Sequence, residues 1–430
     1  MNRRQLMLCI RGVLMATLTV GLSGTVAVSA DPVSDWNAIL FTTSVGENPF
    51  AQARFAAITQ LAVFEAVNAI QGNYKPYLGT ISAPPGASAE AAAIAAAYTV
   101  LTNYFPAAAA SLDTARAASL ARIPNGPGKS SGLAVGEAAA NAMIALRSND
   151  GANPPAFFLP SSSAPGEWQL TPTCPAAGGV FFHWSGVTPF GVQSSAQFRA
   201  DPPPALTGHR YARAYREVKE VGSLDSTERP PDRLKVARFF GAVSAPVAWN
   251  SIARQLATSR RHSSLADEAR IFALLNMAIS DGLVTVFESK YHYRFWRPET
   301  AIRNGDLDGN PRTQADPSFV PLIPTPCFPS YPSAHASGSY AAQRMLRYFY
   351  GDGPHQITLS NAAVPGIVLP YTRLADITDD VDDARVYGGI HFRTDQDAGA
   401  EQGRRIAEYV YRHQLRRQHD RDRDDDDPDH

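Results

Sequence analysis

Three short segments in the second half of the sequence concentrate side chains that could bind and transform an oxyanion. The first contains Lys290 and Arg297, seven positions apart, so two turns of a helix would place both cations on nearly one face. Arginine offers a planar fork of donors and lysine a compact ammonium, a combination that suits a charged ligand. Taken alone, two basic residues on a helix are more often a solvated face.

The second segment ends in a Pro-Ser-x-His sequence, just before a helical pattern over residues 336–349. Ser333 is a good helix-capping residue. We therefore expect Ser333, the amide of Ala334 and His335 to lie at a helix N-terminus, where free N–H groups and the helix dipole attract anions. By itself, this segment is explained more safely as a simple helix cap followed by a surface histidine.

The third segment places Arg385 six residues before His391 and Asp395 four residues after it. The glycines at positions 388 and 389 allow close backbone approach beside the histidine. On a helix, the carboxylate would reach the imidazole and fix its tautomer. A structural His–Asp pair that caps a helix would produce the same pattern, so this segment also needs the other two.

Together, and in this order, the three segments resemble the signature of the type 2 phosphatidic-acid-phosphatase and vanadium-haloperoxidase superfamily. That signature is Lys, six residues, Arg-Pro; then Pro-Ser-x-His; then Arg, five residues, His, three residues, Asp. The sequences around these motifs resemble the haloperoxidases more than the lipid phosphatases. They are Tyr-x-Phe-Trp-Arg-Pro, Phe-Pro-Ser-Tyr-Pro-Ser-x-His-Ala and Gly-x-His-Phe-Arg. The resemblance covers residues 278–403 and implies an all-α helical bundle.

The resemblance also implies a vanadate cofactor, with phosphate able to occupy the same site. His391 would bond the vanadium, and His335 would be the acid–base residue on the opposite side. Phe328 and Trp296 would line the halide and substrate pocket; chloroperoxidases carry Phe at position 328, where many bromoperoxidases carry His. The vanadate oxygens would be held by the following groups: Lys290, Arg297, Ser333, the backbone amide of Ala334, and Arg385.

Two residues depart from the pattern of the superfamily. Ala334 replaces the usual glycine, but an alanine amide still donates a hydrogen bond, so we expect oxyanion binding to survive. Ala384 replaces the serine that normally precedes the arginine. The loss of that hydroxyl should tune the site more than it weakens it.

The favoured function is that of a vanadate-dependent haloperoxidase, which oxidises halide with hydrogen peroxide to a hypohalous-acid equivalent that reacts with a small organic acceptor. His335 would move the peroxide proton and Lys290 would polarise the peroxide. An acid-phosphatase-type phosphomonoesterase is the alternative, with His391 as nucleophile, Asp395 orienting it and His335 protonating the leaving alcohol. A non-catalytic oxyanion-binding protein is the third hypothesis, which the presence of both histidines disfavours.

The rest of the sequence predicts a helical scaffold for these segments. Apolar residues recur at spacings of three and four in the following ranges: 52–70, 89–104, 107–121, 132–146, 211–221, 234–257 and 265–290. Strand signals are few, so we expect one helical bundle domain over residues 31–414. Residues 148–208 lack periodicity, and we expect part of them to line a substrate entrance; an ordinary surface excursion has similar weight.

The two ends of the sequence predict processing and disorder. Paired arginines, an apolar stretch and a small-residue site before Asp31 indicate a signal peptide cleaved after Ala30, and hence export to the periplasm or the medium without a stable membrane anchor. Residues 415–430 are dominated by charge and should form a disordered tail.

Cysteine count and charge add two further constraints. Cys9 would leave with the signal peptide, and Cys174 and Cys327 would remain, either as one disulfide or as two free thiols. A formal net charge of -1 with 18% charged residues indicates no nucleic-acid partner. No feature of the sequence indicates an oligomeric state.

Overall fold

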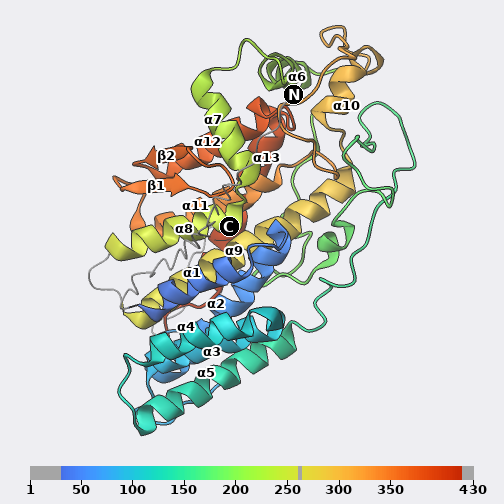
Figure 1. The fold of residues 1–430 in the computed structure, drawn as a ribbon. Helices are drawn as coiled ribbons and strands as arrows, with labels where there is room; N and C mark the ends of the chain where they lie inside the picture. The colour runs from blue at the N-terminus through green and yellow to red at the C-terminus, as the bar shows by residue number, and fades with distance from the viewer. Residues whose placement is uncertain (1–30, 260–263, 419–430) are drawn as a thin grey trace, which may run out of the picture.

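The computed structural model describes residues 31–259 and 264–418, which are mostly helical, as predicted (Figure 1). The predicted signal peptide and residues 419–430 of the predicted tail lie outside the described residues. Residues 415–418, where the tail was expected to begin, lie against residues 73–75: Leu415 is buried, and Arg417 forms a β-bridge with Tyr74. The folded part of the chain therefore continues to residue 418.

The N-terminal helices form one end of the molecule, shown in blue and cyan in Figure 1. They are α1 (Pro32–Thr43), α2 (Pro49–Gln71), α3 (Ala89–Tyr104), the short 3-10 helix η1 (Pro106–Ala108), α4 (Ala109–Leu120) and α5 (Pro127–Leu146). Small residues let α3 and α5 approach closely. A Cβ added at Gly136 of α5 would lie 2.2 Å from the carbonyl oxygen of Ala92 of α3. This confirms that the alanine-rich stretches form scaffold helices.

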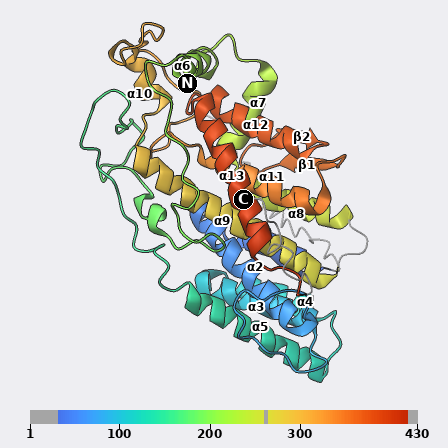
Figure 2. The same cartoon turned by 180° about the vertical axis from the view of Figure 1, so that it is seen from behind.

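The C-terminal helices form the rest of the molecule, and the longest of them, α9, crosses its middle (Figures 1 and 2). They are α6 (His209–Gly222), α7 (Pro231–Ala242), α8 (Ala245–Ser259), α9 (Leu265–Tyr293), α10 (Pro298–Arg303), the 3-10 helix η3 (Gly305–Leu307), α11 (Ala334–Tyr350), α12 (Leu374–Tyr387) and α13 (Arg393–His413). Helices α2 and α9 are apolar and long enough to cross a membrane, but most of each is buried in the structure, as expected for core helices.

Helices α11 and α13 pack with almost no space between their backbones. A Cβ added at Gly403 would lie 2.2 Å from the carbonyl oxygen of Ser337, and one at Gly399 would lie 2.5 Å from that of Ser333. The backbone amide of Ser333 donates to the carbonyl oxygen of Asp395 at 2.9 Å. The N-terminal ends of the two helices, which carry two of the predicted site segments, are thereby held together.

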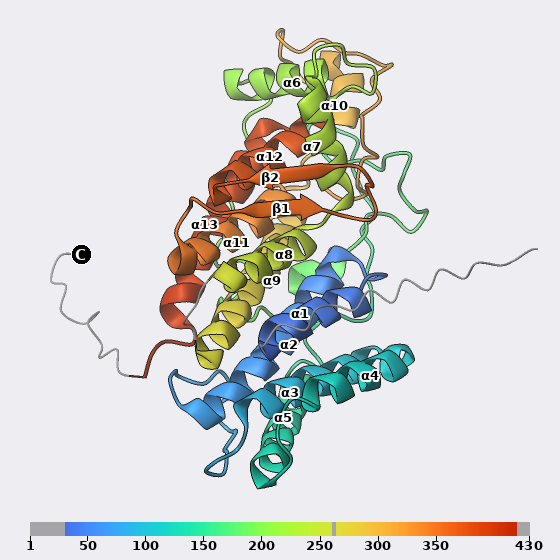
Figure 3. The same ribbon diagram turned by 60° about the vertical axis from the view of Figure 1, so that its left-hand side comes forward.

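Two features differ from the sequence prediction. The expected helix over residues 234–257 is two helices, α7 and α8, because the chain turns at residues 243–244, just before Pro246 in the first turn of α8. Strands β1 (Ile357–Ser360) and β2 (Val368–Tyr371) form an antiparallel hairpin in which Ile357 pairs with Tyr371. Figure 3 shows this hairpin beside α8 and α12. Residues 148–208 are irregular as predicted, apart from η2 (Phe182–Gly186).

Candidate active site

The structure brings the three predicted segments together around the buried imidazole of His391. Its Nδ1 lies 2.9 Å from Oδ2 of Asp395, and its Nε2 lies 3.0 Å from Nη1 of Arg297. A guanidinium can only donate, so Nε2 must accept the hydrogen bond from Arg297. The ring proton is therefore on Nδ1, which donates to Asp395, and the lone pair of Nε2 faces the cations.

The contact between His391 and Asp395 was predicted, but the backbone conformation that brings the two side chains together was not. Helix α13 begins at Arg393, so His391 precedes the helix and Asp395 lies in its first turn. Gly389 adopts a left-handed φ of 78°, and a Cβ there would lie 2.3 Å from the carbonyl oxygen of Gly222. The chain can therefore turn tightly beside α6 just before His391.

The prediction that Lys290 and Arg297 share one helix face was wrong. Helix α9 ends at Tyr293, and Arg297 caps the next helix, α10. Arg294 ends α9 in a left-handed conformation with a φ of 49°, and Pro298 keeps Arg297 extended, because the residue before a proline is pushed out of the helical conformation. Both side chains nevertheless reach the same place from different elements.

Four backbone carbonyl groups orient these two cations, and three of them are consecutive. The ammonium of Lys290 donates to the carbonyl oxygens of Pro329 at 2.9 Å and Ser330 at 2.7 Å. Arg297 donates from Nε to the carbonyl oxygen of Phe328 at 2.8 Å and from Nη1 to that of Ile390 at 2.9 Å. Lys290 keeps a third N–H donor beyond these contacts. No side-chain motif could have indicated this role for the 328–330 backbone.

The Pro-Ser-x-His segment begins a helix, as predicted. Ser333 is the N-cap of α11, and its hydroxyl accepts a hydrogen bond from the amide of Ala336 at 3.3 Å. Ser333 and Ala334 are buried, and His335 is partly exposed. The amide of Ala334 lies in the first turn of α11, where backbone N–H groups have no partner within the helix.

Unused donors on two buried arginines fit an oxyanion. Arg385, in the last turn of α12, donates from Nη1 to the carbonyl oxygen of Phe240 at 2.8 Å. Within the described part of the chain, Nε of Arg385 and Nη2 of Arg297 are buried and have no hydrogen-bond partner. Buried donors of this kind are costly unless a ligand satisfies them. The residues present therefore fit a tetrahedral or trigonal-bipyramidal oxyanion such as vanadate or phosphate.

The electrostatics of the site favour an anion next to neutral histidines. Burial lowers the pKa of Arg297 to about 9 and that of Arg385 to about 10, so both stay charged at neutral pH. Burial, reinforced by Arg297 and Arg385, lowers the pKa of Lys290 well below its usual value. Burial and the same cations lower the pKa of His335 and His391 well below that of a free histidine, which leaves both rings neutral.

Asp395 is the carboxylate at the centre of this cationic cluster. Burial raises its pKa, while a hydrogen bond from Ser330 and the charges of Lys290 and Arg297 lower it. The positive charge of the three basic side chains exceeds what one carboxylate can balance. The excess would attract an anionic ligand.

We expect oxyanion affinity to fall as the pH rises above neutral, because Lys290 loses its proton at a lower pH than an ordinary lysine. Lys290→Gln should weaken phosphate binding near neutral pH, and the ratio of variant to parent dissociation constants should fall toward one as the pH rises. Calorimetric titration at several pH values measures this ratio, in which the ionisation of phosphate itself cancels. Exposed Lys235→Gln is the control; a ratio for Lys290→Gln that stays constant with pH would contradict the prediction.

The two predicted pocket aromatics lie in different surroundings. The ring of Phe328 lies 4.9 Å from Cζ of Arg297 and 5.4 Å from Nζ of Lys290, so it borders the cations. Trp296 is 1% exposed and belongs to a separate hydrophobic cluster, where it stacks on Tyr211 with ring centroids 6.5 Å apart. That packing leaves almost none of Trp296 accessible to a halide.

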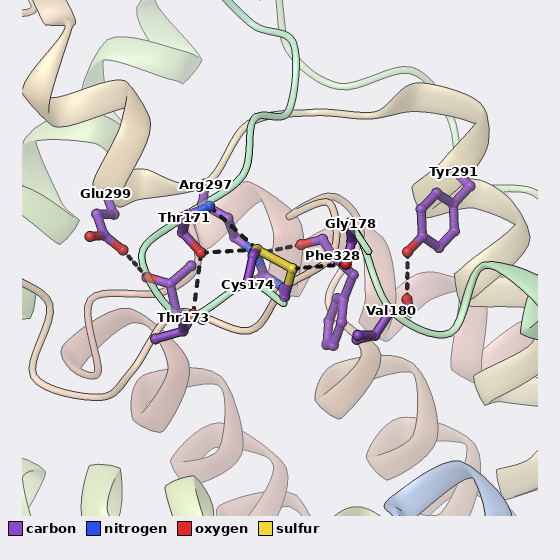
Figure 4. Close-up of a disulfide and its surroundings, with 11 residues drawn as sticks. Thr171, Thr173, Cys174, Gly178, Val180, Tyr291, Arg297, Glu299 and Phe328 are labelled. Atoms are coloured by element: carbon purple, nitrogen blue, oxygen red, sulfur yellow. Dashed lines mark hydrogen bonds between the residues drawn. A yellow bond between two sulfur atoms is a disulfide. The ribbon is translucent and has the colours of Figure 1, made fainter. Parts of the chain in front are cut away.

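A disulfide joins Cys174 to Cys327, which settles the open question about the two thiols (Figure 4). It attaches the irregular segment 148–208 to the chain just before Phe328. Two hydrogen bonds support it: the hydroxyl of Thr173 donates to the carbonyl oxygen of Thr325 at 2.5 Å, and the amide of Val180 donates to that of Cys327 at 2.9 Å. The backbone that orients the cations is thus covalently tied to a distant part of the sequence.

A cleft of about 290 Å³ lies between the start of α2 and the irregular segment. Its aromatic lining residues are Phe55, Phe157, Phe181 and Trp184. The ring centroid of Phe181 lies 6.4 Å from that of Phe328, so Phe181 contacts both the cleft and the ring that borders the cations. The irregular segment therefore lines a cleft near the site.

Comparison with known proteins finds relatives for the part of the chain that carries the site. The family model of the second helical-bundle domain of VCPO matches residues 270–420, which include all the predicted site residues. Residues 270–420 are thus similar to this helical-bundle domain. A vanadium chloroperoxidase of Curvularia inaequalis is 30% identical over an alignment of 192 residues that covers 37% of this chain. The match spans about a third (31%) of the length of that relative.

Solved haloperoxidase structures share the fold over most of the chain. A structure described as the first bacterial vanadium-dependent iodoperoxidase aligns with a TM-score of 0.74 at 24% identity, covering 90% of this chain and 98% of that one. A holo-type bacterial vanadium-dependent chloroperoxidase aligns with a TM-score of 0.66 at 19% identity, covering 85% and 92%. The haloperoxidase fold therefore extends upstream of residue 270, where the sequence had shown only compatible helices.

Proposed function

We propose that this protein is a vanadate-dependent haloperoxidase that oxidises a halide with hydrogen peroxide. The observation that carries the proposal is the orientation of His391. Its Nε2 lone pair faces Arg297 at 3.0 Å, within a buried cluster whose arginines keep unused donors. A neutral imidazole lone pair is the form of histidine that can bond a metal centre.

One residue of the cluster would be the metal ligand, and the others would donate hydrogen bonds to the vanadate oxygens. His391 would ligate vanadium through Nε2. The oxygens would be held by Arg297, Arg385, Lys290, Ser333 and the amide of Ala334. Bound vanadate would supply a Lewis-acidic centre that activates peroxide toward halide without a change in its own oxidation state.

His335 is suited to moving the peroxide proton. Its ring is neutral because burial and three nearby cations disfavour the imidazolium, so it can accept a proton at neutral pH. It is also partly exposed, unlike His391, and a reactant arriving from solvent could reach it. Lys290 would hold positive charge beside the reacting oxygens, and Phe328 would keep water away from the two cations it covers.

The reaction is tested by incubating the chain from residue 31 with orthovanadate, hydrogen peroxide and iodide or bromide. We expect triiodide formation, or bromination of a phenol, that depends on both orthovanadate and peroxide. Hydrolysis of a phosphomonoester without any halide oxidation would instead support the acid-phosphatase alternative, in which Nε2 of His391 attacks phosphorus. The same residues serve both reactions, so only the products distinguish them.

We also propose that the aromatic cleft receives the organic acceptor. Phe157 is 48% exposed on the rim of the cleft, and an aromatic acceptor would pack against it. Phe157→Ala should raise the KM for a phenolic acceptor severalfold and leave triiodide formation, which needs no acceptor, unchanged. Exposed Leu224→Ala, which does not line the cleft, is the control. Unchanged acceptor kinetics would count against this assignment.

We propose further that the mature protein is exported. The disulfide between Cys174 and Cys327 supports export, because disulfides persist in oxidising compartments. N-terminal sequencing of the protein recovered outside the cytoplasm should begin at Asp31. A cytoplasmic protein that retains residue 1 would exclude this proposal.

A further inference from the structure

The hydroxyl of Ser330 contacts the carboxylate that orients His391, although neither the motifs nor the proposed reaction assigns it a role. Oγ of Ser330 donates to Oδ2 of Asp395 at 2.5 Å and lies 3.4 Å from Nδ1 of His391. Ser330 is fully buried, with an exposed fraction of 0%. The hydroxyl is therefore dedicated to this contact and is not a solvated side chain.

The carboxylate of Asp395 uses its two oxygens unequally. Oδ2 accepts hydrogen bonds from Ser330, from Nδ1 of His391 and from the amide of Phe392 at 3.2 Å. Oδ1 is buried and has no partner among the described residues. Since the two oxygens are chemically equivalent, only the surrounding donors decide which one faces His391. Ser330 provides the shortest of these three contacts.

Ser330 is itself fixed by its backbone. Its amide donates to the carbonyl oxygen of Phe295 at 2.9 Å, and its carbonyl oxygen accepts from the ammonium of Lys290 at 2.7 Å. One residue thus connects a cation of the oxyanion site with the carboxylate behind the imidazole. A movement of Ser330 would disturb both.

We propose that Ser330 is a positioning residue for His391. By holding Oδ2 of Asp395 against Nδ1, it fixes the ring in the orientation in which Nε2 faces Arg297 and the oxyanion, so the ring proton stays on Nδ1. The inference rests on the proposed function for its purpose, because a proton on Nε2 would prevent this histidine from ligating vanadium. It acts through Asp395 and does not touch the ligand.

The first readout is the tautomer of His391 in the protein without ligand, seen in two-bond nitrogen–proton correlation spectra of histidine-labelled protein. We expect the parent to carry the proton on Nδ1. In Ser330→Ala the ring should turn away from Arg297 in a share of the molecules, and in that share Nε2 can carry the proton. The second readout is the dissociation constant for orthovanadate. It should rise about tenfold, the lower end of what loss of a supporting hydrogen bond costs at a metal site.

Two comparisons separate positioning from a general structural effect. Threonine and valine side chains have nearly the same size, but only threonine has a hydroxyl. If Ser330→Thr keeps the parent tautomer and affinity and Ser330→Val does not, the effect is due to the hydroxyl. Ser337→Ala removes another buried serine hydroxyl, which donates to the carbonyl oxygen of Gly282 at 3.0 Å, and should change neither readout. The Thr and Val pair also decides the matter if Ser330→Ala does not fold.

Parent-like spectra and affinity in Ser330→Ala, or identical behaviour of the Thr and Val variants, would overturn the inference. Neither readout involves peroxide or halide. If the parent fails to oxidise halide while Ser330→Ala still shifts the tautomer, the proposed function is wrong and the positioning role of Ser330 stands.

Discussion

Replacing His391 with alanine is expected to raise the dissociation constant for orthovanadate by more than about a hundredfold. Loss of a residue that only supports a metal ligand can cost up to about a hundredfold in affinity, and this variant loses the ligand itself. The three cations remain, so weak phosphate binding should survive. Calorimetric titration with both anions would show this difference. A loss restricted to vanadate would identify His391 as a metal ligand and not simply as part of the anion site.

The fold should tolerate this change. His391 precedes α13 and caps no helix, so the circular dichroism spectrum and the thermal midpoint should stay close to those of the parent. His292→Ala is the matched control, since this histidine is exposed in the last turn of α9 near the same site. If His391→Ala bound vanadate like the parent, the geometry around Nε2 would have no bearing on metal binding.

The double variant Cys174→Ser, Cys327→Ser should be strongly destabilised. The disulfide closes a loop of 153 residues, and in the chain-entropy model a loop of that length stabilises the folded state by about 5 kcal/mol. The midpoint of urea unfolding should therefore fall clearly below that of the parent. Treating the parent with a thiol reductant should reproduce the shift, and the same treatment should leave the double variant unchanged.

Loss of the disulfide should also weaken oxyanion binding, because Cys327 directly precedes the residues whose carbonyl groups orient Lys290 and Arg297. We expect a severalfold increase in the dissociation constant for phosphate. The titration is done without urea, at a temperature at which the variant is folded. Unchanged stability would show that the hydrogen bonds of Thr173 and Val180 hold the segment without the covalent link.

The site could be predicted largely from sequence because its chemistry depends on side-chain identity. The Ser333 cap and the pairing of His391 with Asp395 follow from residue types at fixed spacing. The orienting carbonyl groups of residues 328–330 could not be foreseen, since every residue has a carbonyl. The helix-face argument for Lys290 and Arg297 failed because seven-residue spacing was given more weight than the effect of Pro298 on the residue before it.

The fold was harder to predict from sequence where the buried face of a helix consists of small or polar residues. Helix α13 has apolar buried residues mainly near its end, at Ile406 and Val410, and its earlier buried face includes Gly399 and Gly403. Such a face carries little hydrophobic periodicity, so the helix was not predicted. The pairing of Cys174 with Cys327 depends on Cα separation and direction, which sequence does not contain.

Helices α11 and α13 cross so tightly that residues with no chemical role affect the geometry of the candidate site. Gly403 is eight residues from Asp395, roughly 12 Å along the helix at 1.5 Å per residue. A methyl group at Gly403 would collide with the carbonyl oxygen of Ser337 and push α13 away from α11, which would strain the contact between Ser333 and Asp395. Gly399 and Gly403 should therefore tolerate substitution as poorly as the residues of the candidate site, although neither belongs to it.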